Sequence, residues 1–433
     1  QKILEFKNKK KKLKKETLKH KTFYLNNNFI HKIYTKTKSN FLFVIYEKFI
    51  LKFIDPNILI NIRTKKINFF KLCLKLNILG FKGLTIFDRK KLINISNMNI
   101  HEKDKRINMK FIPKSNNEFE NYILNKIKED IPRIFIENFK DIKKIHEKKL
   151  TNIDTVVSDT HHRFNPIFKS WIAHRKNFNK NLKIITADHG GVYGAKSVFN
   201  YNNAISSFVF KYQKKVSKKQ VSLPCLFLNK KKNLLNDKIL IICKDIPKYP
   251  KHFLNGPMCE EIISEFKQIK KFIENLDNPI RQKILIRPYL RRTGWKLDKK
   301  FEEIVGKQNI IYSSTKYNKL RDQAIIRVVN YPQTAFLESV INGPTFLLFN
   351  KKYYYDTKYN EKFMDILFKN KIAFENGKDL SIHLNNINSN VLEWWGQKKV
   401  KECIKIFMNN LNKFEEDPIK SWAKIIKDIT KTN

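Results

Sequence analysis

The stretch AIIRVVNYPQTAFLESVINGPTFLLF, residues 324–349, decides the fold class. Its two ends, 324–329 and 345–349, are apolar runs of strand length, and 333–341 between them suits a helix that begins just after Pro332. A strand, a helix and a strand in this order form a parallel β-α-β unit with a buried sheet. The stretch therefore predicts an α/β fold built on parallel strands.

The same alternation continues on both sides of this stretch. The other predicted strands are 153–157, 182–187, 239–243, 284–287 and 309–312. The other predicted helices are 121–127, 134–145, 167–175, 260–273, 317–322, 359–368 and about 397–412. Residues 23–115 alternate apolar clusters with Lys/Asn stretches and have no readable period.

Composition suggests the division into domains. Residues 1–22 are a Lys-rich basic arm that we expect to be disordered. Residues 211–237 are polar and without periodicity, which is typical of a linker. We therefore expect an N-terminal domain at 23–210, a C-terminal domain at 238–412 and a tail at 413–433.

The charge of the chain has two readings. The 433 residues include 88 Lys and Arg against 40 Asp and Glu, a formal net charge of +48. Lys, Asn, Ile and Phe are all over-used and Gly is scarce, which is the composition of an A/T-rich genome. We therefore expect most of the excess Lys to be solvated surface, with no specific nucleic-acid recognition, although it would attract phosphorylated substrates or anionic membranes.

Cysteine usage and hydropathy exclude several protein classes. The five cysteines are scattered without a C-x-x-C pair, which argues against a disulfide framework or a thiolate zinc site and fits a reducing cytosol. No apolar run approaches the roughly 18 residues of a spanning helix, and no secretion signal is visible. We expect a cytoplasmic protein.

The densest polar cluster is TADHGGVYG, residues 186–194, directly after a predicted strand. Ligands of α/β sheets bind beyond the carboxyl ends of the strands, and glycine allows close approach of the backbone. His189 is therefore placed where it could act as a general base toward an acceptor hydroxyl. The alternative is a tight turn with a hydrogen-bonded histidine.

A second cluster, SDTHHR at 158–163, also follows a strand. Its Asp159–His161 spacing could suit a metal ion, but no further ligands are readable downstream. We expect an ordinary polar loop here, and no metal site.

Two further sites concern phosphate. Thr334 lies at the start of the helix at 333–341, where free N–H groups can bind phosphate, and Glu338 lies one turn deeper, where it could accept from ribose hydroxyls. Arg287 begins RPYLRRTGW, residues 287–295, and its forked guanidinium matches phosphate. The alternative for Thr334 and Glu338 is an ordinary helix with a solvated Glu, and the alternative for Arg287 is a solvated loop.

Together these pieces resemble a known family. IITADHGGVYG at 184–194, RPYLRRTGW, YPQTAFLESVINGPTFLLF at 331–349 and the pair Trp394–Trp395 match in order and spacing a transferase family first noted in spirochaete surface-carbohydrate loci. That family is similar in outline to GT-B glycosyltransferases and to CDP-glycerol glycerophosphotransferases. The resemblance covers about 121–412.

The resemblance implies two Rossmann-like domains that face a cleft, with the acceptor on the N-terminal side and a nucleotide-activated donor on the C-terminal side. It implies His189 as the base, with Gly190 and Gly191 opening the cleft toward the donor. Arg287 and Thr334 would contact donor phosphate, and Glu338 the ribose. The reaction would move a sugar or a polyol phosphate to a glycan or lipid-linked surface-polysaccharide intermediate. It would require no cofactor and no metal, and the protein would make peripheral contact with the inner membrane face.

One position departs from the family pattern, and it supports a rival. We expect Gln before the histidine, but the residue is Asp188, which could orient and charge-stabilise His189 or signal different chemistry. TADHG also resembles the Asp-His metal-binding turn of the alkaline phosphatase and sulfatase superfamily. The rival hypothesis is thus a metal-dependent hydrolase that uses Asp188 and His189, and a third is a basic binding protein without activity.

Overall fold

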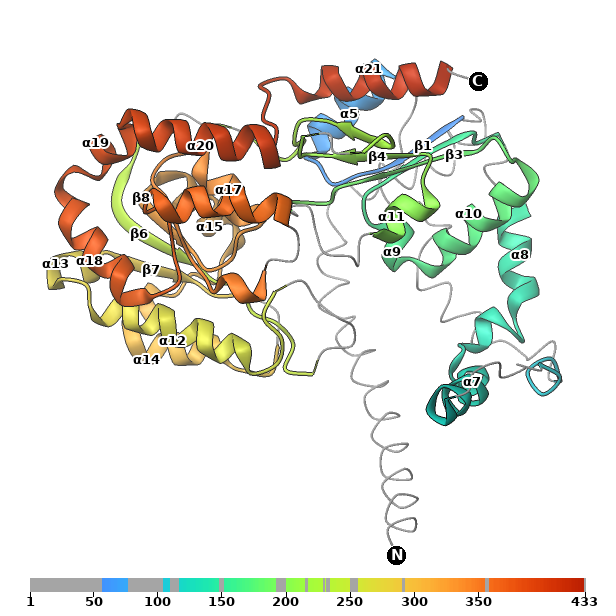
Figure 1. The fold of residues 1–433 in the computed structure, drawn as a ribbon, viewed down its shortest axis with the longest axis horizontal. Coiled ribbons are helices and arrows are strands. Elements are labelled where there is room, and N and C mark those ends of the chain that lie inside the picture. Colours follow the sequence, from blue (N-terminus) through green and yellow to red (C-terminus); the bar gives the residue numbers. More distant parts are fainter. Residues whose placement is uncertain are drawn as a thin grey trace, which may run out of the picture.

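The computed structural model describes residues 57–76, 104–109, 117–147, 152–191, 200–214, 217–228, 230, 234–249, 256–289, 293–354 and 358–431. These residues form two parallel sheets of five strands each, flanked by helices (Figure 1). Two Rossmann-like α/β units in one chain confirm the predicted GT-B-like fold class.

The first sheet has its strands in chain order. It contains β1 (Ile58–Asn61), β2 (Thr155–Ser158), β3 (Lys183–Ala187), β4 (Phe208–Lys211) and β5 (Gln220–Ser222), each parallel to its neighbours. The helices in this part of the chain are α5 (Lys66–Lys75), α7 (Glu118–Asp130), η3 (Arg133–Phe135), α8 (Phe139–Glu147), α9 (His161–Phe164), α10 (Pro166–Phe178) and α11 (Asn200–Ile205).

Apolar residues cover both faces of this sheet. Phe168 and Trp171 of α10 pack with Val156 on one face. The start of α10 is well defined, because the Asn165 side chain accepts a hydrogen bond from the Phe168 N–H and Pro166 occupies the first turn. Helix α5 packs on the opposite face.

The second sheet has the order β10-β9-β8-β6-β7. Its strands are β6 (Asn236–Ile242), β7 (Ile284–Arg287), β8 (Ala324–Val329), β9 (Thr345–Leu348) and β10 (Ala373–Phe374). Its helices are α12 (Glu261–Glu274), α13 (Asn278–Arg281), α14 (Leu297–Val305), η5 (Lys307–Asn309), α15 (Ser314–Gln323), α16 (Thr334–Val340), η6 (Lys351–Tyr353), α17 (Lys358–Lys369), α18 (Gly377–Ile387), η7 (Asn388–Asn390), α19 (Val391–Gly396) and α20 (Lys398–Leu411). The chain direction across the sheet reverses between β6 and β8, which is the topological switch point of a doubly wound sheet.

Strand β6 shows how this sheet is buried on both sides. Ile239 and Ile241 belong to the apolar cluster that includes α12, α14 and α18. Leu240 and Ile242 belong to the cluster that includes α16, α17 and α20. This second cluster continues into the first sheet, so one apolar core joins the two halves of the molecule.

The chain returns to the first sheet at its end. Helix α21 (Pro418–Lys431) packs against α5, as Figure 1 shows at the top of the view. Its Trp422 donates a hydrogen bond from Nε1 to the Pro224 carbonyl (2.8 Å) and meets the Phe210 ring edge-on. The segment expected as a tail therefore contains a helix that belongs to the core of the first half.

Several elements differ from the sequence-based expectation. Residues 309–312 make only an isolated bridge, Ile286 to Ile310, and no strand. Strand β1 and helix α5 lie in the stretch without a readable period, and β5 lies in the expected linker. The basic arm at 1–22 lies outside the described residues. No helix in the described part of the chain is long and apolar enough to cross a membrane.

Candidate active site

Four strands of the first sheet end at one edge, and polar residues stand at or just beyond each of these ends. Arg63 follows β1, Asp159 follows β2, Asp188 and His189 follow β3, and Lys211 ends β4. Because the strands are parallel and adjacent, their carboxyl ends bring these residues together.

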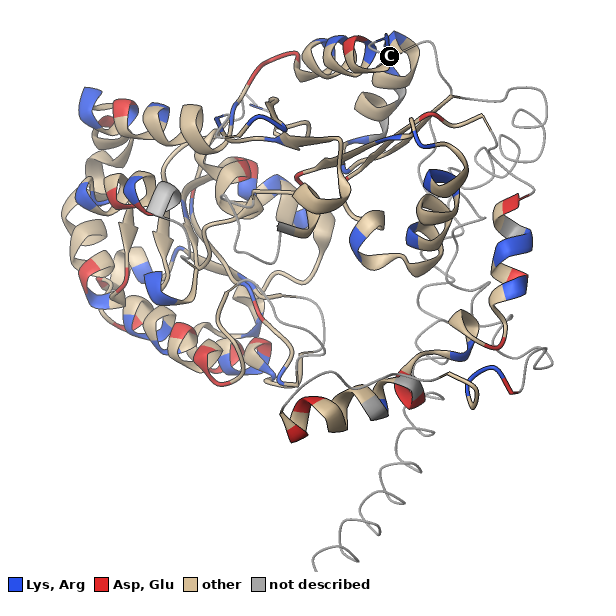
Figure 2. Ribbon diagram, turned by 45° about the vertical axis from the view of Figure 1, so that its right-hand side comes forward, with Lys and Arg blue, Asp and Glu red and all other residues tan. Residues whose placement is uncertain are grey.

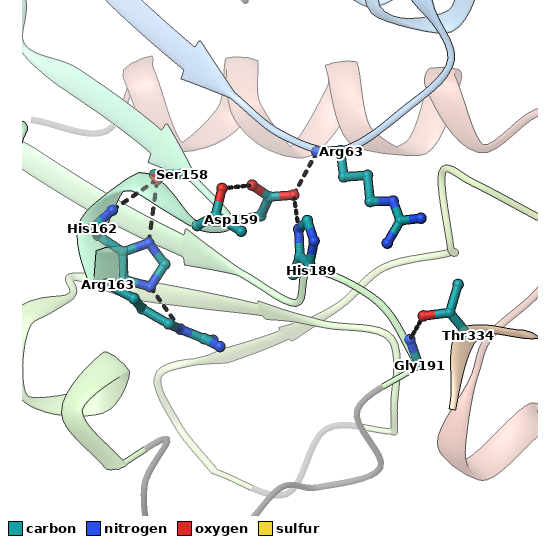
Figure 3. Close-up of polar contacts among 9 residues, drawn as sticks. Arg63, Ser158, Asp159, His162, Arg163, His189, Gly191 and Thr334 are labelled. Atoms are coloured by element: carbon teal, nitrogen blue, oxygen red, sulfur yellow. Dashed lines mark hydrogen bonds and ion pairs between the residues drawn. The ribbon is translucent and has the colours of Figure 1, made fainter. Parts of the chain in front are cut away.

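His189 is held by Asp159. Its Nδ1 lies 2.9 Å from Asp159 Oδ2 (Figure 3). The Asp159 side chain is 4% exposed, whereas that of His189 is 41% exposed. A carboxylate at Nδ1 favours the tautomer with the proton on that nitrogen, which leaves the Nε2 lone pair available to accept a proton. This is the arrangement of an oriented general base.

Asp159 is itself fixed by its neighbours. Its Oδ2 also accepts from the backbone N–H of Arg63, and its Oδ1 accepts from the Thr160 hydroxyl (3.0 Å). Its own N–H donates to the Asn61 carbonyl (3.0 Å). A buried carboxylate with this many hydrogen-bond donors around it keeps one orientation.

Asp188 faces a different partner, which corrects its expected role. Its Oδ1 lies 3.0 Å from Lys211 Nζ, and its Oδ2 accepts from the Tyr212 N–H (3.2 Å). Both side chains of the ion pair are less than a tenth exposed. Asp188 therefore ties β3 to β4, and the orienting contact to His189 comes from Asp159.

The second cluster divides into two parts. His162 is fully buried, with its ring nitrogens 3.2 Å from Ser158 Oγ and 3.0 Å from Asn202 Oδ1. Burial lowers the pKa of His162 to about 4, so this histidine is neutral and structural. Asp159 is the member of the cluster that lies in the site, although the sequence alone predicts an ordinary polar loop for it.

Gly190 and Gly191 lie against the start of helix α16 from the second sheet. The Gly191 N–H donates to Thr334 Oγ1 (3.2 Å). A Cβ on Gly190 would lie 2.4 Å from Thr334 Oγ1, and one on Gly191 would lie 2.5 Å from Leu337 Cδ1. The two glycines therefore permit close contact between the halves of the molecule, and the Thr334 hydroxyl is an acceptor in that contact.

Glu338 lies on the same helix and forms an ion pair. Its Oε2 is 2.7 Å from Arg321 Nη1, and its side chain is 24% exposed. Arg321 also pairs with Asp322 (3.1 Å). The carboxylate predicted to contact ribose is thus oriented by a cation and remains partly accessible.

Arg287 is positioned by carbonyl groups. Its Nη1 donates to the carbonyls of Ile311 and Tyr312, each at 2.8 Å. Its guanidinium lies 4.9 Å from the centre of the Tyr317 ring, and burial lowers its pKa. These contacts fix the orientation of the Arg287 guanidinium. Arg291 and Arg292 of the same motif lie outside the described residues.

A pocket of about 500 Å³ adjoins the carboxyl ends of β6 and β7. Asp245 lies in its wall, accepts from the Thr293 hydroxyl and has its pKa raised by burial. Lys244, Tyr289 and Tyr312 also line it. The sequence did not single out Lys244 or Asp245, since neither stands in a recognisable motif.

A metal site is not evident in the described part of the chain. No group of three or more His, Cys, Asp or Glu side chains there is placed to hold an ion. Asp188 and His189 do not converge, because Asp188 is bound by Lys211 and His189 by Asp159.

Comparisons with solved structures find distant likenesses. S. aureus MnaA in a structure with UDP is 10% identical, with 87% of this chain and 97% of that chain covered and a TM-score of 0.46. The UDP-GlcNAc 2-epimerase from Neisseria meningitidis bound to UDP-GlcNAc is 12% identical, with 87% and 100% covered and a TM-score of 0.44. The wall teichoic acid polymerase TagF, in a structure with an H444N substitution and CDPG, is 12% identical, with 85% and 99% covered and a TM-score of 0.35.

Sequence comparison gives the family. No curated protein matches the chain. The model of the LIC12162 family transferases matches residues 1–426, which includes the first 120 residues that the resemblance had left uncovered. Because this model matches nearly the whole sequence, the chain belongs to the LIC12162 transferase family.

Proposed function

We propose that this transferase moves a sugar, or a polyol phosphate, from a nucleotide-activated donor to a hydroxyl of a surface-polysaccharide intermediate. The observation that carries the proposal is the contact between His189 and the buried Asp159 at the edge that meets α16. A half-exposed imidazole with a fixed tautomer suits the removal of a proton from an acceptor hydroxyl.

The step balances without a further reagent. His189 Nε2 takes the proton of the acceptor hydroxyl, and the acceptor oxygen forms a bond to the anomeric carbon of the sugar, or to phosphorus if a polyol phosphate is moved. The bond from that atom to the nucleotide breaks, and the nucleoside diphosphate, or monophosphate, leaves with the electron pair. Arg287 at the end of β7 and Glu338 on α16 are proposed to bind donor phosphate and ribose.

The proposal needs neither a metal nor a cofactor, since arginine and backbone N–H groups can neutralise the charge of a diphosphate. The rival metal-dependent hydrolase makes the opposite prediction. Thermal shift of the purified chain against UDP, CMP, CDP and GDP, with and without EDTA, separates the two. A rise in melting temperature with one nucleotide, unaffected by EDTA, supports the transferase and identifies the base of its donor.

His189→Ala then tests the role of the base. The variant should keep the nucleotide-induced shift and lose turnover by about 10²- to 10⁴-fold. His174→Gln, on α10 beside Phe178, is the matched control and should keep both. Full turnover by His189→Ala would contradict the assignment.

We also propose a cytoplasmic enzyme in peripheral contact with the inner membrane face, where lipid-linked acceptors are found. The support is the net charge of +48, which attracts a protein to anionic lipid. Figure 2 shows Lys and Arg spread over the helices of both halves among Asp and Glu, which favours a diffuse attraction over a specific nucleic-acid groove. Cosedimentation with vesicles containing anionic lipid should therefore fall steeply as salt is raised.

A further inference from the structure

We propose that Arg63 binds a phosphate group carried by the acceptor. This inference rests on the proposed function, because it assigns the acceptor side of the same site. It adds a chemical class that the fold and the family do not name: the acceptor hydroxyl activated by His189 belongs to a molecule with an anionic phosphate nearby.

Arg63 is tied to the catalytic pair through its backbone. Its N–H donates to Asp159 Oδ2, the same oxygen that lies 2.9 Å from His189 Nδ1. Arg63 lies two residues beyond the first strand of the sheet, and Asp159 directly follows the second. The position of the Arg63 backbone relative to the His189 ring is therefore fixed by one shared carboxylate oxygen.

The side chain of Arg63 extends into the site. Figure 3 shows its guanidinium beside the His189 ring, on the side of Gly191 and Thr334. The residue is exposed, and among the described residues its guanidinium has no hydrogen-bond or ion-pair partner. An exposed cation at the open side of a general base is available to an anionic ligand.

Four other cations in the described part of the chain are already engaged. Lys211 pairs with Asp188, and the Nε of Arg163 faces His162 and Asn202. In the second half of the molecule, Arg287 donates to carbonyls and Arg321 pairs with Glu338. Arg63 thus differs from all four in having its full set of donors available to a ligand.

The choice of arginine at this position is informative. Of the 88 cationic residues in the chain, 12 are arginine, so lysine is the ordinary surface cation here. Arginine differs from lysine in its planar fork of donors, which matches two oxygens of a phosphate. Because Arg63 and His189 follow strands of the first sheet, the phosphate that they meet is assigned to the acceptor and not to the donor.

The experiment measures binding of glycerol 3-phosphate, with glycerol as the uncharged reference, by isothermal titration calorimetry. Wild type should bind the phosphate and not glycerol, and Arg63→Ala should lower the affinity about tenfold or more. Arg63→Lys should lie between the two, because lysine offers a point charge without the fork. Arg133→Ala, an exposed arginine on η3, removes the same charge elsewhere and should bind like wild type.

Two further arms identify the source of the phosphate and separate the two proposals. With the nucleotide that gives the largest thermal shift present at saturation, glycerol 3-phosphate should still bind; competition would place Arg63 on donor phosphate and overturn the assignment. Equal affinity in wild type and Arg63→Ala, or equal losses in Arg63→Ala and Arg133→Ala, would also overturn it. His189→Ala should keep the binding, so a failed base assignment leaves this test intact.

Discussion

His189 Nδ1 lies 2.9 Å from Asp159 Oδ2, although thirty residues separate the two in the chain. The contact exists because β2 and β3 are adjacent parallel strands whose carboxyl ends lie side by side. It makes one carboxylate responsible for the tautomer and orientation of the proposed base. The predictions below test this assignment and the packing that supports it.

Asp159→Asn should lower turnover by about 10²- to 10⁴-fold with little change in nucleotide binding. The amide keeps the shape of the side chain but loses the charge that stabilises the protonated imidazole and selects the tautomer. Steady-state kcat and the thermal shift with nucleotide are the measurements. A variant that loses nucleotide binding but keeps kcat would contradict the role of Asp159.

Asp188→Asn should reduce stability more than chemistry. Removing one partner of a buried ion pair leaves Lys211 uncompensated, which costs about 3–5 kcal/mol of unfolding free energy. The double variant Asp188→Leu, Lys211→Met should recover much of that loss, because it leaves no unpaired buried charge. Urea unfolding of the three proteins checks this, and a stable Asp188→Asn enzyme with turnover as low as His189→Ala would restore Asp188 to the chemistry.

Gly190→Ala should destabilise the contact between the two halves by about 1–3 kcal/mol, since the new methyl would meet Thr334 Oγ1. Adding Thr334→Ala removes that oxygen and should restore the melting temperature. Gly191→Ala is the matched control, because its methyl would meet Leu337 Cδ1 and the α16 backbone, which Thr334→Ala does not relieve. Equal rescue of both glycine variants would show that the close approach does not limit stability.

Acid should destabilise the fold through its buried histidines. Burial lowers the pKa of His383 to about 4, while the unfolded chain titrates near the usual value of about 6.5. Between these values the unfolded state binds the proton and the folded state does not, so stability falls with pH by up to about 3 kcal/mol for this site. His383 packs against Phe346 and Trp394. In His383→Phe, the urea-unfolding midpoint should therefore change less between pH 7 and pH 4 than it does in wild type. If the midpoint depends on pH equally in the variant and in wild type, the pKa of His383 is not lowered by folding.

The second half of the chain was the more readable from sequence. Its strands are buried on both faces, so they appear in the sequence as continuous apolar runs, such as 324–329 and 345–349. Strand β5 has three residues, two of them polar, and therefore carries no such signal. Helix α21 has apolar residues at helical spacing, Ile419, Trp422, Ala423, Ile426 and Ile429, and so could have been predicted as a helix. The sequence does not show which surface it covers, because that surface lies some two hundred residues earlier, near Pro224.

The candidate site was readable in part. His189 and its glycines stand out because glycine is scarce in this chain. Asp188 was given the wrong partner because neighbours in sequence are not neighbours in space: consecutive residues of an extended segment point to opposite faces. Asp159 and Arg63 became visible only with the strand order β1-β2-β3, which no local pattern encodes.

The most direct test of the central claim is a double-mutant cycle on turnover with His189→Ala and Asp159→Asn. If Asp159 acts only through His189, the double variant should turn over at the same rate as His189→Ala alone. Losses that simply multiply would show that the two residues act independently and would contradict the account.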